Sequence, residues 1–209
     1  GTDIGVFTSN DNGQQWTPQT DGPATVPVEQ LLWKNDNTLL AVTHGRGMYL
    51  GTEAVVFPID YTLVSDMRTH GPLQSLFSSD DEYLRLETKP FQNPDSRKTV
   101  IDFHATSPTQ TPSQLQVRIE SNIQEGRLTQ VQQRIEMRNY STGKLESYAI
   151  RQPTSADESI VIEPTGDLSR FVEPGSQRVT ARLSWAGEMI SGLDPAWNVY
   201  IDEVVWSIE

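Results

Sequence analysis

Apolar and polar residues alternate in three segments of the second half of the chain, and this alternation constrains the fold most. The segments span residues 115–120, 131–138 and 178–185. A period of two residues is typical of a β-strand with one buried face and one wet face. Turn sequences such as Pro164-Thr165-Gly166 and Pro174-Gly175 separate the strand-like runs from residue 60 onward. Eight or nine such runs predict a two-sheet β-sandwich with a jelly-roll-like arrangement.

The first quarter of the chain carries shorter strand-like runs, at residues 4–8, 28–33, 38–43 and 47–51. Asn, Asp and Gly turns separate the later runs, so we expect an antiparallel meander. Between the runs at 4–8 and 15–17 lies an octet of the form S-x-D-x-G-x-x-W. Its defining residues are Ser9, Asp11, Gly13 and Trp16.

This octet resembles the Asp-box, or BNR repeat, of sialidase-type β-propellers, and residues 43–49 (Thr-His-Gly-Arg-Gly-Met-Tyr) resemble the final-blade pattern of bacterial propellers of this type. The resemblance covers residues 1 to about 52 and implies a remnant of the last blades, with other blades or chains of a parent protein as partners. It further implies a structural role for the octet: Asp11 caps turn amides, Gly13 takes a positive φ, and Trp16 packs into the blade.

The strand pattern changes near residues 53–60, where Pro58 would interrupt a strand ladder. We therefore predict two domains in an all-β chain. Residues 1–57 form the antiparallel blade remnant, and residues 58–209 form the β-sandwich.

The charge of the chain excludes some classes of partner. Sixteen basic and 28 acidic side chains give a net charge of −12, which repels nucleic acid and anionic membranes. The sequence contains no cysteine, and no apolar run approaches the ~18 residues that a membrane-spanning helix needs.

The sequence gives no sign of a catalytic site. It has no G-x-S-x-G motif and no thiol, and its histidines at 70 and 104 have no second ligand at metal-binding spacing. Adjacent carboxylates, as in Asp157-Glu158 and Asp202-Glu203, point to opposite faces of a strand and make poor acid/base pairs. We therefore expect this chain to be non-enzymatic, although an upstream propeller could be a glycoside hydrolase.

His44 and Arg46 form a candidate ligand-binding site on a turn. A His and an Arg on a Gly-flanked turn can bind a carboxylate or a phosphate. The alternative, which we favour, is a tight hairpin in which His44 caps the backbone.

Residues 58–209 also carry a resemblance, in the segments 76–83, 139–143, 170–172 and 199–204. These segments are similar to a sandwich module found at the ends of large secreted bacterial proteins, and to carbohydrate-binding jelly rolls. In such jelly rolls an Asp on the last strand often helps to hold a structural calcium ion. The resemblance implies this role for Asp202, with Asp80 or Asp81 as a second ligand; calcium prefers six or more oxygen ligands. No other cofactor is expected.

The outward positions of the predicted strands are polar: Gln116, Arg118, Glu120, Gln132, Arg134, Glu136, Arg138, Arg178 and Arg182. The aromatic Trp185 is expected in the core, and Tyr140, beside a turn, is the exception to this pattern. A planar sugar-binding platform of aromatic rings is therefore disfavoured, while binding at loop tips stays open.

The last strand has a conflict of parity. Val199 and Ile201 lie on one face, whereas Val204, Trp206 and Ile208 lie on the other. One extra residue would bring both sets to the same dry face, so we predict a β-bulge at Asp202-Glu203 that turns Trp206 inward.

Together these features predict a non-catalytic C-terminal region of a larger exported bacterial protein, outside the cell or at its surface. Its role would be binding, spacing or anchoring, with an extracellular protein or a glycan as partner. The alternative is a carbohydrate-binding accessory module of a propeller glycosidase.

Overall fold

The computed structural model describes the chain as all-β, as predicted. It describes residues 1–8, 16–18, 23, 25–35, 38–52, 55–88, 98–124, 131–187 and 197–209. Within these residues the secondary structure consists of strands and short 3-10 turns, and no helix is long and apolar enough to cross a membrane.

The chain divides into two compact units, Gly1–Ala54 and Val55–Glu209. The sequence placed this boundary three residues later, after residue 57. The difference has a structural reason: β6 (Val55–Val56) pairs with the last strand of the second unit, with Val56 opposite Trp206 and Val55 opposite Ser207.

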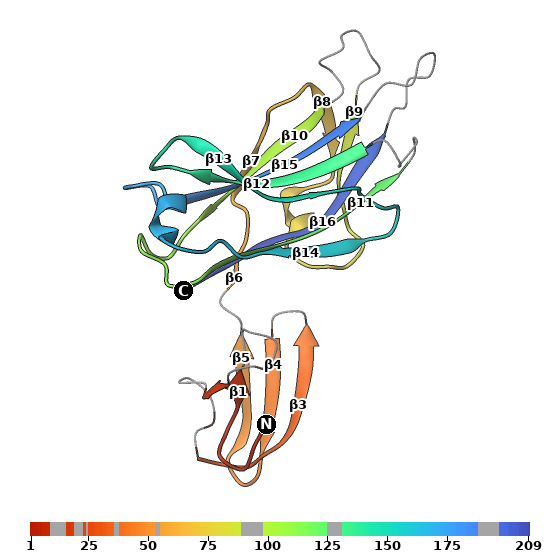
Figure 1. Ribbon diagram of the computed structural model, residues 1–209. Helices are drawn as coiled ribbons and strands as arrows, with labels where there is room; N and C mark the ends of the chain where they lie inside the picture. Colours follow the sequence, from red (N-terminus) through yellow and green to blue (C-terminus); the bar gives the residue numbers. More distant parts are fainter. Residues whose placement is uncertain are drawn as a thin grey trace. The chain divides into compact units, whose positions relative to one another are not determined.

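The first unit contains a two-stranded and a three-stranded sheet (Figure 1). Strands β1 (Phe7–Thr8) and β2 (Thr17–Pro18) form the former. The predicted meander forms the latter, from β3 (Val28–Asn35), β4 (Thr38–Thr43) and β5 (Gly47–Thr52). One face of this sheet is apolar and uncovered within the unit, because Leu32, Leu40 and Leu50 share a cross-strand row and Leu32 and Leu50 are exposed.

The structure describes only part of the octet that resembles an Asp-box. Ser9, Asp11 and Gly13 lie outside the described residues. The expected burial of Trp16 is wrong, since its side chain is 62% exposed. Trp16 lies directly before β2, in a sheet of two strands. The propeller remnant stays a prediction.

The second unit is the predicted two-sheet sandwich, with every strand pairing antiparallel (Figure 1). One sheet has the strand order β13-β12-β15-β10-β7, and the other has β14-β11-β16-β9-β8, with β6 added beside β16. The first sheet comprises β7 (Asp60–Leu63), β10 (Lys98–Thr106), β12 (Val131–Asn139), β13 (Lys144–Arg151) and β15 (Arg178–Gly187). The second comprises β8 (Met67–His70), β9 (Leu84–Thr88), β11 (Leu115–Gln124), β14 (Glu158–Ile162) and β16 (Asn198–Ile208).

The core between the sheets follows the alternation read from the sequence. Its largest fully buried side chains include Trp185, Trp206, Phe103 and Phe171. Gln133 occupies an inward position of β12 but is satisfied there: its Nε2 donates to Ser121 Oγ of the other sheet at 3.0 Å, and its Oε1 accepts from Arg151 Nε at 2.6 Å. A buried amide with both ends bonded avoids the cost of an unpaired polar group.

The predicted bulge in the last strand is confirmed. In the pairing of β11 with β16, Glu120 lies opposite Glu203 and Ser121 lies opposite Ile201, which leaves Asp202 as the extra residue. Val199, Ile201, Val204 and Trp206 are all fully buried as a result. The bulge thus resolves the conflict of parity.

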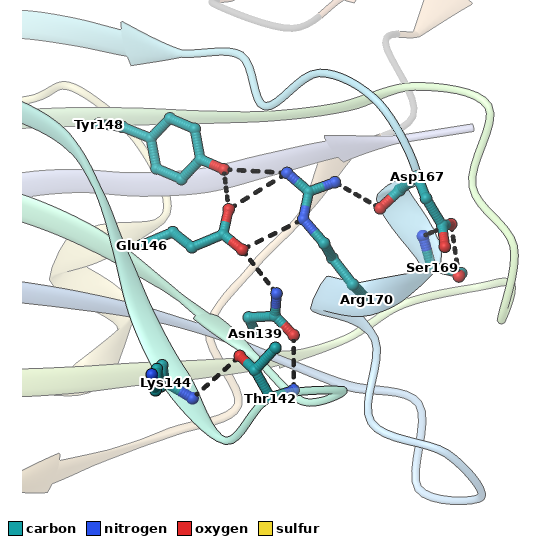
Figure 2. A network of polar contacts seen from close by, with 8 residues as sticks. All are labelled: Asn139, Thr142, Lys144, Glu146, Tyr148, Asp167, Ser169 and Arg170. Carbon is teal, nitrogen blue, oxygen red and sulfur yellow. Dashed lines mark hydrogen bonds and ion pairs between the residues drawn. The ribbon is translucent and has the colours of Figure 1, made fainter.

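A polar network surrounds the carboxylate of Glu146 on β13 (Figure 2). The 3-10 turn η4 (Leu168–Phe171) places Arg170 so that its Nε and Nη2 donate to the carboxylate of Glu146 at 3.3 and 3.2 Å. Asn139 Nδ2 and Tyr148 Oη also donate to this carboxylate, at 2.6 and 2.8 Å. These donors, Arg170 first, lower the pKa of Glu146 to about 2. Two of the segments singled out in the sequence, 139–143 and 170–172, therefore meet here in a structural role.

Candidate functional site: the outer face of the five-stranded sheet

The outward side chains of the five-stranded sheet are mostly polar, with Ile150, which lies opposite Arg134 on the edge strand β13 and is 53% exposed, as an apolar exception. On β15 the buried Val179, Ala181 and Leu183 alternate with Thr180 and Arg182, which therefore point outward. Pairing aligns these positions in cross-strand rows, one of which contains Thr62, Asp102, Arg182, Glu136 and Ser147. We call this surface the outer face, defined by Asp60, Thr62, Asp102, His104, Arg134, Glu136, Arg138, Tyr140, Arg178, Thr180 and Arg182.

A chain of hydrogen bonds crosses the outer face from β7 to the end of β12. Thr62 Oγ1 lies 3.0 Å from His104 Nε2, and His104 Nδ1 lies 2.9 Å from Thr180 Oγ1. The hydroxyl of Tyr140 completes the chain at 2.8 Å from Thr180 Oγ1. Burial lowers the pKa of His104, so its imidazole is neutral at pH 7, with one nitrogen donating and the other accepting. The hydroxyl groups of Thr62 and Thr180 can each donate or accept, so they can bond to either tautomer of His104. These hydrogen bonds hold the four side chains in place.

Arg182 is anchored more firmly than the other arginines of the outer face. Its Nε and Nη2 donate to the two carboxylate oxygens of Asp102 at 2.6 and 2.7 Å. This bidentate hydrogen bond is the main cause that raises the pKa of Arg182. Planar guanidinium–carboxylate pairs of this type combine strength with fixed orientation.

The other three arginines have looser contacts. Arg134 lies 3.9 Å from Glu136 and Arg178 lies 3.8 Å from Asp60, and their side chains are 44% and 42% exposed. Arg138 holds its guanidinium carbon 5.8 Å from the centre of the Tyr140 ring. Within the described part of the chain, no hydrogen bond or ion pair satisfies the Arg138 guanidinium. These groups retain donors for a ligand, since each guanidinium carries five N–H groups.

The opposite surface, the outward side of the six-stranded sheet, is instead rich in carboxylates. Tyr83 Oη bonds to Asp157 Oδ2 at 2.8 Å and to Asp81 Oδ1 at 3.1 Å. Glu203 accepts two bonds from Arg118, at 2.6 and 3.0 Å. The two sides of the sandwich thus differ in charge.

Asp202 lies in this acidic cluster and is 1% exposed. Its Oδ2 accepts from the Asp81 amide at 3.3 Å, while its Oδ1 has no hydrogen-bond partner in the described structure. Burial is the main cause that raises the pKa of Asp202 to about 6, with smaller contributions from Glu120 and Asp157.

The three residues expected to bind calcium lie near one another, but the carboxylates of Asp80 and Asp81 accept hydrogen bonds from their own loop. Asp80 accepts from Ser78 Oγ and the Glu82 amide, at 2.8 and 3.1 Å, and Asp81 accepts from Tyr83. Among the described residues, no three acidic, His or Cys side chains are grouped so as to hold a metal ion. Calcium needs six or more oxygen ligands, and calcium binding stays a prediction.

His44 and Arg46 lie in the turn between β4 and β5. Gly45 and Gly47, both at φ +82°, provide the turn conformation, and Thr43 Oγ1 donates to the Gly47 carbonyl at 2.7 Å. His44 does not cap the backbone as expected: its Nδ1 lies 3.0 Å from Glu29 Oε1. A carboxylate already beside His44 disfavours an anionic ligand there, and binding at this turn stays a prediction.

Sequence reasoning found the outward arginines but missed the chain of Thr62, His104, Thr180 and Tyr140. These contacts join residues 42, 76 and 40 positions apart. The alternation along each strand indicates that Thr180 and His104 point outward, and this was the only sign of the site that the sequence offered. Their contact depends on the pairing of β10 with β15, which the sequence does not show.

Comparisons with known proteins give no family. No family model matches the chain, and no curated protein matches it. Among solved structures, the xylan-binding module CBM15 is 11% identical, with 73% of this chain and 95% of that chain covered and a TM-score of 0.44. CBM28, a module specific for non-crystalline cellulose, is 10% identical over 68% and 79% of the two chains, with a TM-score of 0.40. Variants of a family 29 carbohydrate-binding module, 10–11% identical, have TM-scores of 0.33–0.35. At these values the similarity carries no argument for this chain, whose sandwich is established by its own strand pairing.

Proposed function

We propose that residues 55–209 are a non-catalytic carbohydrate-binding module of a larger exported protein, and that the outer face of the five-stranded sheet is its binding surface. The observation that carries this proposal is the hydrogen-bonded chain from Thr62 through His104 and Thr180 to Tyr140. His104 and Thr180 are buried, at 8% and 2% exposed, and hold the exposed Thr62 and the half-buried Tyr140 in place. Sugar hydroxyls both donate and accept, and the hydroxyls of Thr62 and Tyr140 together with the half-exposed guanidinium groups offer both roles without being reordered on binding.

The same face is poorly suited to catalysis. Each of its carboxylates lies beside an arginine: Asp102 accepts from Arg182 at 2.6 Å, and Asp60 and Glu136 lie in looser ion pairs, 3.8 Å from Arg178 and 3.9 Å from Arg134. A catalytic carboxyl group must offer a free oxygen to the substrate, whereas both oxygens of Asp102 already accept hydrogen bonds from Arg182. Binding without turnover is the function that this chemistry supports.

The test is a binding screen of the full chain against neutral and charged polysaccharides, by affinity gel electrophoresis and then calorimetry. Binding that weakens at least fivefold in Tyr140→Ala, with the melting temperature retained, would support the proposal. An absence of binding to every polysaccharide would overturn it.

The first unit supports a second, separate role in protein contact. Its three-stranded sheet exposes Leu32, Met48 and Leu50 on one face, and Trp33 is exposed as well. Uncovered apolar faces of this kind mark protein contacts. We propose that this sheet packs on other blades or chains of the parent protein, and size-exclusion chromatography with light scattering tests whether it associates.

A further inference from the structure

We infer that the polysaccharide bound by the outer face is anionic, and that its sugar carboxylates are held by the arginines of the two central strands. This inference rests on the proposed function and names the class of its ligand.

The arginines form a zigzag along β12 and β15. Arg134 lies opposite Ser184, and Glu136 lies opposite Arg182. Continuing this register places Arg138 opposite Thr180 and Arg178 one row further on. Each of four successive rows therefore holds one arginine. Alternate residues of a strand are ~6.7 Å apart, so the array extends over roughly 20 Å. An array of this length suits an extended chain with a repeated charge.

The balance of charge on the outer face is opposite to that of the whole chain. The face holds four arginines, at 134, 138, 178 and 182, against three carboxylates, at 60, 102 and 136, in a chain of net charge −12. Because acidic groups dominate elsewhere, including the cluster of Asp81, Asp157 and Asp202, an anionic chain is repelled from the other side of the sandwich and guided to this one.

The aromatic content of the face points the same way. Neutral sugars bind flat surfaces through stacked rings, but Tyr140 is the one aromatic side chain among the residues that define this face, and Arg138 lies beside its ring at 5.8 Å. The face itself already shows the bond that we infer for the ligand: Asp102 binds Arg182 in the bidentate form. Guanidinium groups match planar carboxylates better than lysine ammonium groups do.

The experiment compares polygalacturonate with its fully methyl-esterified form, which has the same backbone without the charge. Dextran and dextran sulfate serve as a neutral and a sulfated pair. For the full chain at 50 mM NaCl we expect binding to polygalacturonate, at least tenfold weaker binding to the methyl ester, and weakening at 300 mM NaCl through screening.

Matched variants assign this binding to the face. Arg138→Gln should weaken polygalacturonate binding at least tenfold, and Arg138→Lys should weaken it less. The control Arg68→Gln removes the same charge from an exposed position on β8, in the other sheet, and should stay within twofold of the wild type. Equal melting temperatures show that all three fold.

The outcomes separate the inference from the proposed function. Equal binding to polygalacturonate and its methyl ester, or preference for neutral glycans, would overturn the inference and leave carbohydrate binding in place. Tighter binding to dextran sulfate than to polygalacturonate would overturn the assignment to carboxylates. Equal losses in Arg138→Gln and Arg68→Gln would overturn the assignment to this face, and no binding to any of these polymers or to the wider screen would overturn both proposals.

Discussion

Replacing Asp202 by asparagine should stabilise the protein at neutral pH, although the residue is buried in the core strand β16. Its carboxyl group is 1% exposed and its Oδ1 has no hydrogen-bond partner in the described structure. Burial raises its pKa from the ordinary value of 3.8 to about 6. Ionised Asp202 is therefore a cost that the folded state carries at pH 7.

The sign of the effect follows from the direction of the pKa shift. A pKa that is higher in the folded state means that the folded protein holds the proton more tightly, so the contribution of Asp202 to stability is greatest below pH 4 and is lost as pH rises through 6. Two pH units correspond to about 3 kcal/mol at ~1.4 kcal/mol per unit. An asparagine side chain at this position would not titrate, would keep an oxygen to accept from the Asp81 amide, and would turn an NH2 group toward the carboxylates around it.

Urea unfolding at pH 4.5 and pH 7.5 in EDTA measures this directly. We expect Asp202→Asn to be more stable than the wild type by about 2–3 kcal/mol at pH 7.5 and by about 1 kcal/mol or less at pH 4.5, where the carboxyl group of the unfolded chain is already mostly ionised. Glu82→Gln, at an exposed position, is the control and should follow the wild type. If Asp202→Asn were less stable than the wild type at pH 7.5, or had the same pH dependence, the reasoning would be refuted.

Three other experiments probe the polar network, the tryptophans and the acidic cluster. Glu146→Gln should lower the free energy of unfolding by about 1–2 kcal/mol at pH 7, after allowance for solvent screening. Because the pKa of Glu146 is lowered to about 2, this difference from the wild type should shrink as pH falls from 4.5 toward 2. Thermal melts across that pH range would show it. Trp185→Ala should lower the free energy of unfolding by about 3–5 kcal/mol because it leaves a cavity in the core, whereas Trp16→Ala should lower it by about 1 kcal/mol or less. Equal losses in urea unfolding would contradict the exposure of Trp16. Calcium titration at pH 7.5 should leave the melting temperature unchanged with Asp80, Asp81 and Asp202 arranged as they are, and a rise of several degrees that Asp202→Asn abolishes would establish the calcium site expected from the family resemblance.

Much of the sandwich could be predicted because its signals are local. The alternation around Trp185 identifies its inward face within a few residues, and the clash of parity between Ile201 and Val204 is enough to locate the bulge at Asp202. The pairing of β6 with β16 was missed because Pro58 suggested an interrupted ladder, while Val55 and Val56, just before it, lie opposite Ser207 and Trp206.

The candidate site was less accessible to sequence reasoning. Parity showed that Arg138 and Arg182 point outward, but a solvated ladder of charges gives the same pattern. What distinguishes this face is the link from His104 to Thr180, which are 76 residues apart, and the engagement of Asp102 by Arg182, 80 residues apart. Such contacts depend on which strands become neighbours, and a single sequence does not contain that information in local form. Trp16 shows the opposite error: the motif implied a buried indole, but the residue is 62% exposed, because a local motif does not determine what packs over its side chain.

The most direct test of the central claim is to locate bound glycan on the sandwich by NMR. Backbone amide and arginine Nε–Hε signals of the full chain would be followed during titration with short oligogalacturonates. The account predicts that the shifts concentrate on residues 134–140 of β12 and the turn after it, and on residues 178–184 of β15, with the Nε–Hε signal of Arg138 among the largest. Shifts confined to the outward side of the six-stranded sheet or to the loop tips would contradict it.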